Sequence, residues 1–330
     1  MSSPWNDAAR SRPVRHLPAL ARRWRGQRRR LEVVYVTLSD PVTGTGAWVH
    51  HELVSPVVGP PYVHGWAAVF GAGAEPVVDR FGPKEIAPHA SSPGSLRWGE
   101  LDDMAFEPPT LRGRGGRLAW QLRIEDHPDQ EMFTFPRWAW DRELLPGAQV
   151  VPVPSARIGG SVQVDGDRIE LSPDTRGAVA HVYGHGNAER WGWLHGELGG
   201  GDVVEIVAAV SRRPGLDRLA PLPFVQLRVA GRDWPRHPML AAPLLRAELG
   251  LPRWQVHGTV GRWRLRVTVD IPESQSVSLD YRDPDGASAT CTNSELADAD
   301  IVLERRAGRW ETAAHWIVKG TAHAEIGTRP

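Results

Sequence analysis

The sequence predicts an all-β protein of the sandwich or barrel type. Short runs rich in β-branched and aromatic residues follow one another along most of the chain, and turn-forming residues separate them. The 29 prolines and 34 glycines are spread along the 330 residues, which argues against long helices. Hydrophobic residues make up 41% of the chain, so the strands have enough apolar side chains to form a real core.

The predicted strands begin after a basic N-terminal segment. The run LEVVYVTLS is followed by the turn DPVTGTG and a second run, AWVHHELV. Another hairpin is expected around Asp165 and Gly166, inside SVQVDGDRIEL. Residues 239–250 are the only stretch of plausible helical length, and Pro243 lies inside it. The expected strands are 31–39, 47–54, 62–70, 117–125, 161–171, 176–185, 190–198, 202–210, 224–231, 262–270, 276–282, 287–293, 300–306, 309–318 and 321–327.

Proline and glycine divide the chain near its middle. Segment 136–160 reads PRWAWDRELLPGAQVVPVPSARIGG, which is typical of an extended connection rather than of a core strand. We therefore expect a first β-barrel over 31–145, a proline-rich connection over 146–160 and a second β-barrel over 161–330. No exact internal repeat supports a duplication.

Residues 1–30 form a separate basic segment. Nine of them are arginine and only one, Asp7, is acidic, and the apolar region of a secretory signal is missing. We expect a solvated, disordered tail whose removal leaves the fold intact, in a cytoplasmic protein. The alternative is a membrane-associated protein, in which the tail makes peripheral contact with anionic lipid, helped by Leu17, Leu20 and Trp24.

Composition excludes several classes of protein. Basic and acidic residues both number 39, so the net charge is zero and no nucleic-acid partner is expected. The single cysteine, Cys291, cannot form an intrachain disulfide, and no apolar run reaches the roughly 20 residues of a membrane-spanning helix. The P-loop, dinucleotide-binding, G-x-S-x-G, HExxH and paired CxxC motifs are absent. The 15 tryptophans, against four tyrosines, suit a core or an apolar ligand cavity.

One stretch, HVYGHGNAERWGWLHGEL at 181–198, concentrates proton-transferring and aromatic side chains. We expect a hairpin in which 181–185 and 189–198 pair across a turn at Gly186-Asn187. Side chains alternate along a strand, so every second residue shares a face. If the two faces meet, they form one wall of a cavity with the side chains of His181, Tyr183, His185, Trp191, Trp193 and His195.

Three interpretations of this wall remain open. In the first it is catalytic: His185 or Glu189 donates a proton, and the two tryptophans stabilise a carbocation through their π faces. Tyr183 positions the proton and His181 assists its transfer. In the second, the three histidines of the wall hold a metal ion. In the third, the imidazoles bond to backbone carbonyls and the indoles only fill a core.

Several stretches resemble the tocopherol cyclase-like proteins and their relatives, the carotenoid hydratases (hydroxyneurosporene synthases) and the AttH-type proteins. The tyrosine strand followed by a W-x-W strand in AHVYGHGNAERWGWLHGEL is similar to a feature of this group, as is the ending with Cys291 and Glu325-Ile326-Gly327. The turn HGNAER is shorter than the corresponding segment of the relatives. The similar stretches are 31–70, 180–198, 203–216, 224–234, 262–269 and 289–327.

The resemblance implies two lipocalin-like antiparallel β-barrels in tandem, a long isoprenoid or similar apolar lipid as ligand, and no cofactor. The implied chemistry is protonation of an alkene followed by ring closure, water addition or isomerisation. Tyr183, His185, Trp191 and Trp193 match motif positions, with the tryptophans as ligand-binding residues. His181, Glu189 and the ligand-binding His195 come from the alternation alone. Four residues near the C-terminus are expected either to line the same cavity or to close the second barrel: Cys291, Asn293, His323 and Glu325.

Two rival functions accompany this hypothesis. A lipocalin-like carrier would bind the same apolar ligand without converting it. A metal-dependent enzyme of the cupin sort would contain a stoichiometric metal ion, against our expectation of none. Histidines and a tryptophan of the first barrel are further candidates by residue type only: His50, His51, His64 and Trp66.

Overall fold

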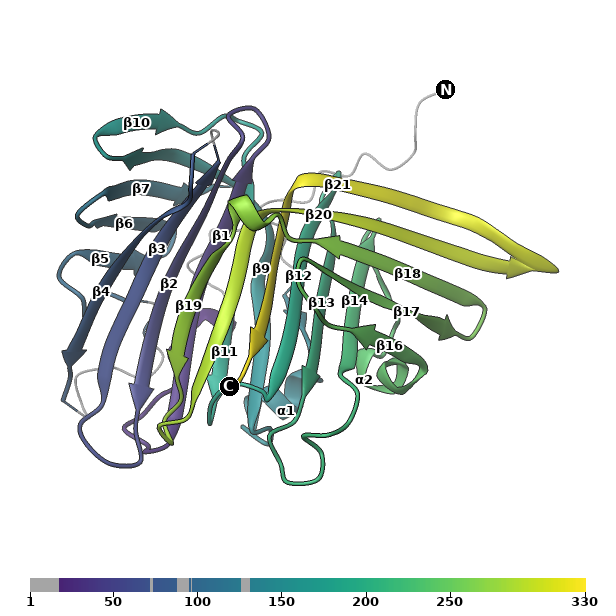
Figure 1. Cartoon of the computed structure of the whole chain (residues 1–330), viewed down its shortest axis with the longest axis horizontal. Helices are drawn as coiled ribbons and strands as arrows, with labels where there is room; N and C mark the ends of the chain where they lie inside the picture. Colours follow the sequence, from purple (N-terminus) through teal and green to yellow (C-terminus); the bar gives the residue numbers. More distant parts are fainter. Residues whose placement is uncertain (1–17, 72–73, 88–94, 96, 126–130) are drawn as a thin grey trace.

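The computed structural model describes residues 18–71, 74–87, 95, 97–125 and 131–330. Within them the strands form two large antiparallel sheets that lie side by side, each curled around its own interior (Figure 1). The predicted all-β fold with two lipocalin-like barrels in tandem is therefore confirmed. Among the described residues, no helix is long and apolar enough to cross a membrane.

The first sheet uses the strands of residues 30–184. They are β1 Arg30–Asp40, β2 Thr45–Ser55, β3 Tyr62–Gly71, β4 Val77–Glu85, β5 Met104–Glu107, β6 Thr110–Arg114, β7 Leu118–Ile124, β8 Met132–Phe133, β9 Gly147–Val164, β10 Asp167–Glu170 and β11 Arg176–Gly184, with helix α1 Arg137–Asp141 before β9. Their order is β4-β3-β2-β1-β11-β9-β7-β6-β5, and β8 and β10 also pair with β9. The expected hairpin at Asp165-Gly166 is the turn between β9 and β10.

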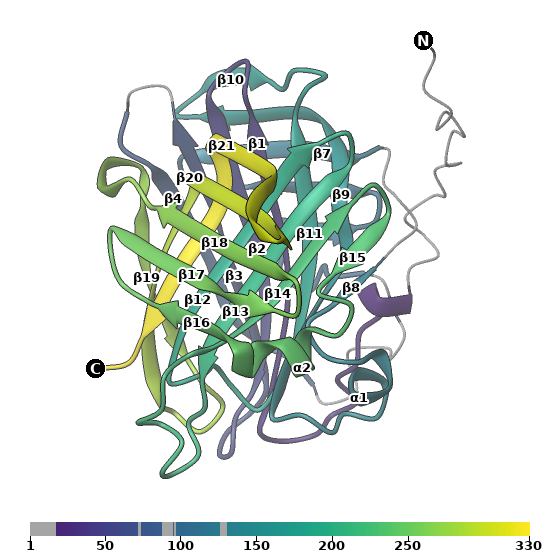
Figure 2. The ribbon, with the colours of Figure 1, turned by 90° about the vertical axis from the view of Figure 1, so that its right-hand side faces the viewer.

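The second sheet uses the rest of the chain. Its strands are β12 Arg190–Gly199, β13 Asp202–Val210, β14 Leu222–Val229, β15 Arg232–Trp234, β16 Leu245–Glu248, β17 Arg253–Val260, β18 Trp263–Asp270, β19 Val277–Arg282, β20 Ser288–Ala307 and β21 Arg309–Thr328. Their order is β15-β14-β13-β12-β21-β20-β18-β17-β16, and β19 pairs with β20 (Figure 2). Both sheets share one plan, in which the last strand lies between the first strand and a preceding long strand.

The change from one sheet to the other falls later than the sequence suggested. Segment 146–160, expected as a connection, is almost entirely strand β9, which lies between β7 and β11. Its prolines are tolerated because the register of β9 with β11 shifts on both sides of Val153, and a residue without an N–H fits such irregularities. The first sheet therefore extends to Gly184, and residues 185–189 connect the two sheets.

Part of the basic N-terminal segment packs against the first sheet. Residues 1–17, with Leu17, lie outside the described residues, but Leu20 and Trp24 are buried in the first core. The carboxylate of Glu32 accepts hydrogen bonds from the backbone N–H groups of Arg23 (2.6 Å) and Trp24 (2.8 Å). The prediction of a disordered tail is therefore wrong for residues 18–30. Membrane contact stays a prediction.

The prediction of a helix over 239–250 is wrong beyond the first turn. Helix α2 covers Pro238–Ala241, a 3-10 turn covers Ala242–Leu244, and strand β16 follows. The residues of β16 alternate between buried and exposed, which is the period of a strand. In the C-terminal region two pairs of expected strands are each one continuous strand, β20 and β21, because irregularities in register replace the expected breaks.

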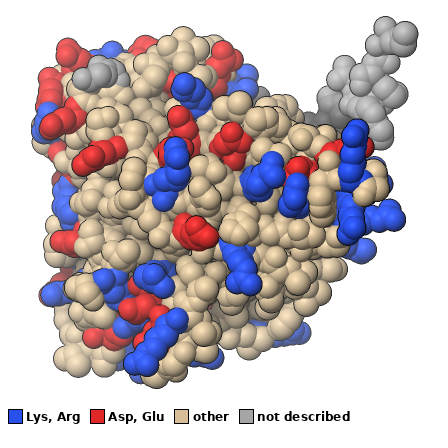
Figure 3. Space-filling view, turned by 45° about the vertical axis from the view of Figure 1, so that its right-hand side comes forward, with Lys and Arg blue, Asp and Glu red and all other residues tan. Residues whose placement is uncertain are grey.

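Three hydrophobic clusters result from this arrangement. One fills the first sheet, one fills the second, and a third lies between the sheets. Alternation along β1 sends Val34 and Val36 into the first sheet, and Val33 and Tyr35 into the cluster between the sheets. The outer surface in Figure 3 carries charged side chains of both signs, scattered over its face.

Candidate functional site

The prediction that residues 181–198 form a hairpin is wrong. Strand β11 pairs with β1 and β9 in the first sheet, whereas β12 pairs with β13 and β21 in the second. The two strands are neighbours in sequence but not in a ladder. The alternation within each strand is as expected: His181 and Tyr183 share one face, and Trp191, Trp193 and His195 share another. These two faces do not form one wall.

His181 lies inside the first sheet and is fully hydrogen-bonded. Its Nδ1 is 2.6 Å from the carbonyl oxygen of Ala19, and its Nε2 is 3.0 Å from Oε1 of Glu32. The edges of Trp98 and Trp140 face its ring at centroid distances of 5.8 and 5.2 Å. Both ring nitrogens are occupied, so this imidazole anchors the N-terminal segment to the first core.

Tyr183, His185 and Glu189 lie at the end of β11 and in the connection between the sheets. The Tyr183 hydroxyl accepts a hydrogen bond from Nε of Arg30 (3.2 Å), and burial raises its pKa to about 12. His185 is exposed, 2.9 Å from Nη1 of Arg30, and partial burial together with that guanidinium lowers its pKa. Glu189 is partly exposed and 3.7 Å from Nε of Arg329. These residues do not join the tryptophans of β12.

The tryptophans of β12 belong instead to a dense group of aromatic and ionisable side chains between the sheets, which we call the inter-sheet cluster. Every member named here is buried except Glu325, which is half-buried. The first sheet contributes Tyr35, Thr37, Trp48, His50, Glu52 and Trp66; the second contributes Trp191, Trp193, His195, Glu205, Tyr281, Cys291, Asn293, Glu295, His323 and Glu325.

Glu205 organises one end of this cluster. Its Oε1 accepts hydrogen bonds from Nε1 of Trp193 and from Nε2 of Gln149, each at 2.7 Å. Its Oε2 is 2.9 Å from Nδ1 of His195, whose ring stacks on that of His323 at a centroid distance of 5.9 Å. The carboxylate therefore fixes both an indole and an imidazole in the interface.

Glu325 lies next to the other indole. Its Oε1 accepts a hydrogen bond from Nε1 of Trp191 at 2.7 Å, and its Oε2 accepts one from Sγ of Cys291 at 3.4 Å. Burial raises the pKa of Glu325, and these bonds oppose the shift without cancelling it. Burial likewise raises the pKa of Cys291 well above its usual value, so this thiol stays protonated. A carboxyl group of raised pKa thus lies against an indole.

Glu295 is a second carboxyl group of raised pKa, and it is buried. Its Oε2 contacts the hydroxyl of Thr37, across the interface, and Nδ1 of His323. Burial raises the pKa of Glu295 well above its usual value, and repulsion from Glu325 adds to the shift. Gly46 of the first sheet comes so close that a Cβ there would lie 2.7 Å from the Cβ of Glu295.

The first-sheet side of the cluster is mostly aromatic. The ring of His50 stacks on Trp66 at a centroid distance of 3.8 Å, and Trp48 meets both rings edge-on. Tyr35 lies edge-on to Trp193 at 5.4 Å, and Tyr281 lies edge-on to Trp66 at 5.2 Å. Burial raises the pKa of both tyrosines well above 10, so both phenols are neutral hydrogen-bonding groups.

This arrangement places candidate proton donors in a largely buried, aromatic environment. Neutral carboxyl groups are acids, and the faces of tryptophan and tyrosine attract a developing cation. The predicted metal ligands His181, His185 and His195 lie in different sheets or in their connection and cannot bind one ion. Across the described part of the chain, no group of three or more histidine, cysteine or acidic side chains could hold a metal.

Sequence reasoning placed part of the cluster but missed its carboxylates on β2, β13 and β20. Trp191, Trp193, His195, Cys291, Asn293, His323 and Glu325 were among the expected cavity residues, whereas Glu205, Glu295, Glu52, Tyr35 and Tyr281 were not. A usable signal existed: in VVEIVAAV at 203–210 a single charged residue, Glu205, interrupts an apolar strand. Acidic residues are almost never fully buried unless paired, so such an exception indicates a site.

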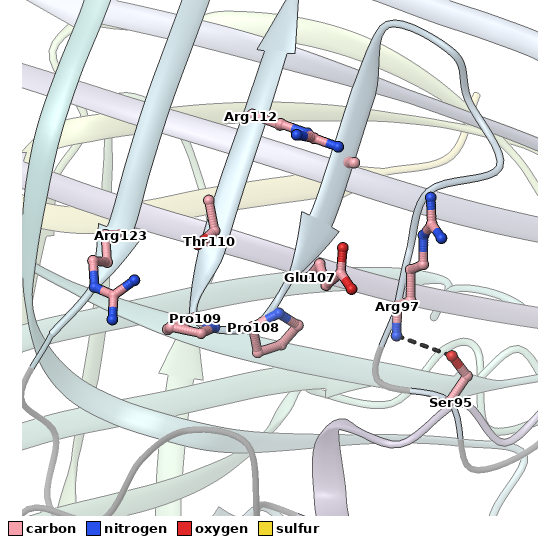
Figure 4. A pocket seen from close by; sticks show the side chains of 9 residues that line it. Ser95, Arg97, Glu107, Pro108, Pro109, Thr110, Arg112 and Arg123 are labelled. Carbon is pink, nitrogen blue, oxygen red and sulfur yellow. Dashed lines mark hydrogen bonds between the residues drawn. The ribbon is translucent and has the colours of Figure 1, made fainter.

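A separate cavity of about 720 Å³ lies on the outer face of β5, β6 and β7 (Figure 4). Its lining includes Arg97, Arg112, Arg123 and Glu107, all exposed, and no residue of the inter-sheet cluster. Open, charged walls do not suit a long apolar ligand. The inter-sheet cluster is therefore the better candidate for such a ligand.

Comparison with known proteins identifies relatives of this chain. Residues 115–328 match the sequence profile of the tocopherol cyclase-like family. Uncharacterised proteins from two strains of Mycobacterium tuberculosis are 50% identical over 307 residues, which is 93% of this chain and 89% of theirs.

Three solved structures share the fold at low identity. A Nitrosomonas europaea protein assigned as AttH has a TM-score of 0.58 at 14% identity, covering 91% of this chain and 93% of that one. CghA has a TM-score of 0.57 at 12% identity, with 91% and 88% covered. Kievitone hydratase from Nectria haematococca has a TM-score of 0.56 at 12% identity, with 96% and 95% covered.

Proposed function

The chain belongs to the tocopherol cyclase-like family, and we propose that it binds an apolar, isoprenoid-like molecule between its two sheets and catalyses an acid-initiated cyclisation, hydration or isomerisation there. The observation that carries this proposal is a pair of carboxyl groups in an aromatic interface, the buried Glu295 and the half-buried Glu325, whose raised pKa favours the protonated form. A raised pKa increases the protonated fraction of a carboxyl group, and the protonated form can donate to a weakly basic substrate.

Glu325 is the proposed proton donor, because its surroundings suit a cation better than those of Glu295. It lies beside Trp191, whose ring is edge-on to that of Tyr281 at 6.2 Å. Glu295 contacts Thr37 and His323, a hydroxyl and an imidazole, instead. The proton leaves the carboxyl oxygen and forms a C–H bond with the alkene π electrons, which leaves a carbocation on the neighbouring carbon.

Trp191 and Trp193 are the proposed ligand-binding residues, together with His195. Each indole that faces the carbocation contributes about 0.5–2 kcal/mol. A tenfold rate change corresponds to about 1.4 kcal/mol, so these contacts alone supply only a few orders of magnitude. The cation then collapses when a phenol oxygen closes a ring, when water adds, or when a neighbouring carbon loses a proton. No cofactor takes part in these steps.

The names of the relatives agree with this class of chemistry. The family is named for a cyclase and one structural neighbour is a hydratase, and both ring closure and water addition can start from a protonated alkene. The identity with that neighbour is 12%, so the reaction assigned here rests on the inter-sheet cluster.

The proposal is tested by incubating the full chain with kievitone and with a panel of prenylated phenols, in H₂O and in D₂O, with mass spectrometry of the products. Cyclisation gives an isomer that carries one solvent deuterium on carbon, and hydration adds the mass of water. We expect Glu325→Gln to reduce turnover by at least about a hundredfold. The control is Glu32→Gln, which alters a fully buried carboxyl group in the first core and should retain turnover in the folded protein.

Other outcomes separate the rival functions. Binding of the panel without any turnover by the wild-type chain would favour the carrier. Loss of turnover in His185→Ala or Glu189→Gln, with Glu325→Gln still active, would favour a site at the connection between the sheets. Stoichiometric iron, zinc or manganese in the purified protein would favour the metal-dependent enzyme. Mass spectrometry of lipids that co-purify with the chain would identify the natural ligand class.

A further inference from the structure

We propose that His50 is the general base of this site, with Nδ1 as the accepting atom and with Glu52 as the residue that positions it. This inference rests on the proposed function and assigns the group that removes the second proton of the reaction. His50 and Glu52 lie on the same face of β2, two residues apart, in the first-sheet wall of the inter-sheet cluster.

The tautomer of His50 follows from its contacts. Nε2 lies 3.0 Å from Oε2 of Glu52, so the N–H is on Nε2 and donates to the carboxylate. Nδ1 then carries the lone pair. It is buried and has no hydrogen-bond partner among the described residues. A buried acceptor without a partner costs about 1–3 kcal/mol, which a protein retains most readily where a ligand supplies the missing donor.

The charge of Glu52 is held in place by a second histidine. His64 lies opposite Glu52 in the ladder of β2 and β3, and its Nε2 is 3.3 Å from Oε1 of Glu52. Burial opposes ionisation, yet His64 and the hydrogen bond from His50 lower the pKa of Glu52 to about 2. The carboxylate is therefore ionised at neutral pH and can keep the Nε2–H of His50 in place.

Burial keeps His50 itself neutral, since it lowers the pKa of the imidazole against the opposing effect of Glu52. The ionisable groups around the ring are Glu52, His64, Tyr35 and Tyr281. His64, on the other oxygen of the Glu52 carboxylate, opposes protonation of the ring. Both phenols are neutral, so the imidazole faces one negative charge, that of Glu52 on its Nε2 side. That charge also stabilises the imidazolium that forms when Nδ1 accepts a proton.

The rings of the cluster link the proposed acid to the proposed base. Trp191 bonds to Glu325 and lies edge-on to Tyr281, and Tyr281 lies edge-on to His50 at a centroid distance of 5.9 Å. After Glu325 has protonated the alkene, a phenol or water oxygen attacks the cation with its lone pair. Nδ1 of His50 takes the O–H proton, whose bonding pair stays on oxygen. Solvent returns a proton to Glu325 and removes one from His50.

The neighbouring residue provides a matched control. His51 is equally buried and also has an unpartnered ring nitrogen, Nε2, and burial lowers its pKa to about 3. Alternation turns it to the opposite face of β2, away from Trp66 and the inter-sheet cluster. A general effect of replacing a buried histidine on this strand would appear in both variants, whereas a catalytic effect is confined to His50.

The first experiment reads the tautomer by ¹⁵N NMR of the full chain with labelled histidine rings, the signals being assigned with His50→Gln and His51→Gln. At pH 7 we expect His50 to be neutral, with Nε2 protonated and Nδ1 bare, and this preference to weaken in Glu52→Gln. Addition of a prenylated phenol should shift the Nδ1 signal of His50 and leave His51 unaffected. An imidazolium, or a proton on Nδ1, in the wild type would overturn the inference.

The second experiment measures turnover of a prenylated phenol that the wild type converts. We expect His50→Gln to reduce turnover by at least about a hundredfold and added imidazole to restore part of the turnover of His50→Ala. The turnover of His51→Gln should stay within a few-fold of the wild-type value. Equal losses in both glutamine variants, or a fully active His50→Gln, would overturn the base role. Binding of the phenol without a shift at His50 overturns only this inference. Failure of the wild type to bind or convert any phenol overturns the proposed function, and the base role with it.

Discussion

Trp24 offers a sharp test of whether the N-terminal segment belongs to the fold. Its side chain is 1% exposed in the first core, and its Nε1 donates a 2.8 Å hydrogen bond to the carbonyl oxygen of Gln27. A buried tryptophan removes about 200 Å² from water, which at about 25 cal/mol per Å² corresponds to ~5 kcal/mol as an upper value. Substitutions of this kind usually cost about 3–5 kcal/mol. We expect Trp24→Ala to lower the free energy of unfolding by that amount.

The assay is equilibrium unfolding in urea, followed by circular dichroism. Trp138→Ala is the control, because that indole lies on the short helix α1 and is 55% exposed; its loss should change the unfolding free energy by no more than about 0.5 kcal/mol. If both variants lose less than about 1 kcal/mol, residues 18–30 are not part of the core, and the expectation of a dispensable tail would be right after all.

Three further predictions concern the inter-sheet cluster. The folded pKa of Glu295 exceeds its unfolded value of about 4.3, so its contribution to stability is complete below that pH and is lost as pH rises. In urea unfolding at increasing pH, the free energy of unfolding of Glu295→Gln should therefore rise relative to that of the wild type by up to about 1.4 kcal/mol for each pH unit above this value. A difference in free energy that does not change with pH would contradict the raised pKa. Gly327→Ala places a Cβ 2.1 Å from the indole of Trp191, and we expect it to lower the free energy of unfolding by about 1–3 kcal/mol in the same assay. The control is Gly116→Ala, which should cause no loss because the atom nearest to its new Cβ is 3.9 Å away. Cys291 is buried and its thiol is protonated, so it should react with a thiol-specific reagent only after unfolding, and rapid labelling of the native protein would show that the interface is open.

The sequence pattern predicted the class of fold and most strands, because alternation is local. The same alternation correctly placed Trp191, Trp193 and His195 on one face of β12, with Leu194 on the other. Pairing is not local. Two strands joined by a short turn were expected to form a hairpin, but β11 completes the first sheet and β12 begins the second. Nothing within 181–198 distinguishes these outcomes.

The partners of the candidate site come from distant parts of the chain for the same reason. Glu325 meets Trp191 because β21 pairs with β12, and Thr37 meets Glu295 because the two sheets lie face to face. Single residues can flag such a site, as Glu205 does in an apolar strand, but only the topology shows which of them meet.

The two sheets remain separate ladders throughout the described residues, and this affects how a bulky molecule can enter. Sliding one sheet against the other breaks no strand pairing. It disturbs side-chain links such as those from Ser39 Oγ to the carbonyl oxygen of Thr321 (3.1 Å) and from Gln149 to Glu205 (2.7 Å), and the loop hydrogen bond from the N–H of Val57 to the carbonyl oxygen of Pro284 (2.9 Å). If the proposed apolar ligand binds between the sheets, we expect it to enter without melting either ladder, so that backbone amides of the strands on both sides keep their protection from hydrogen exchange.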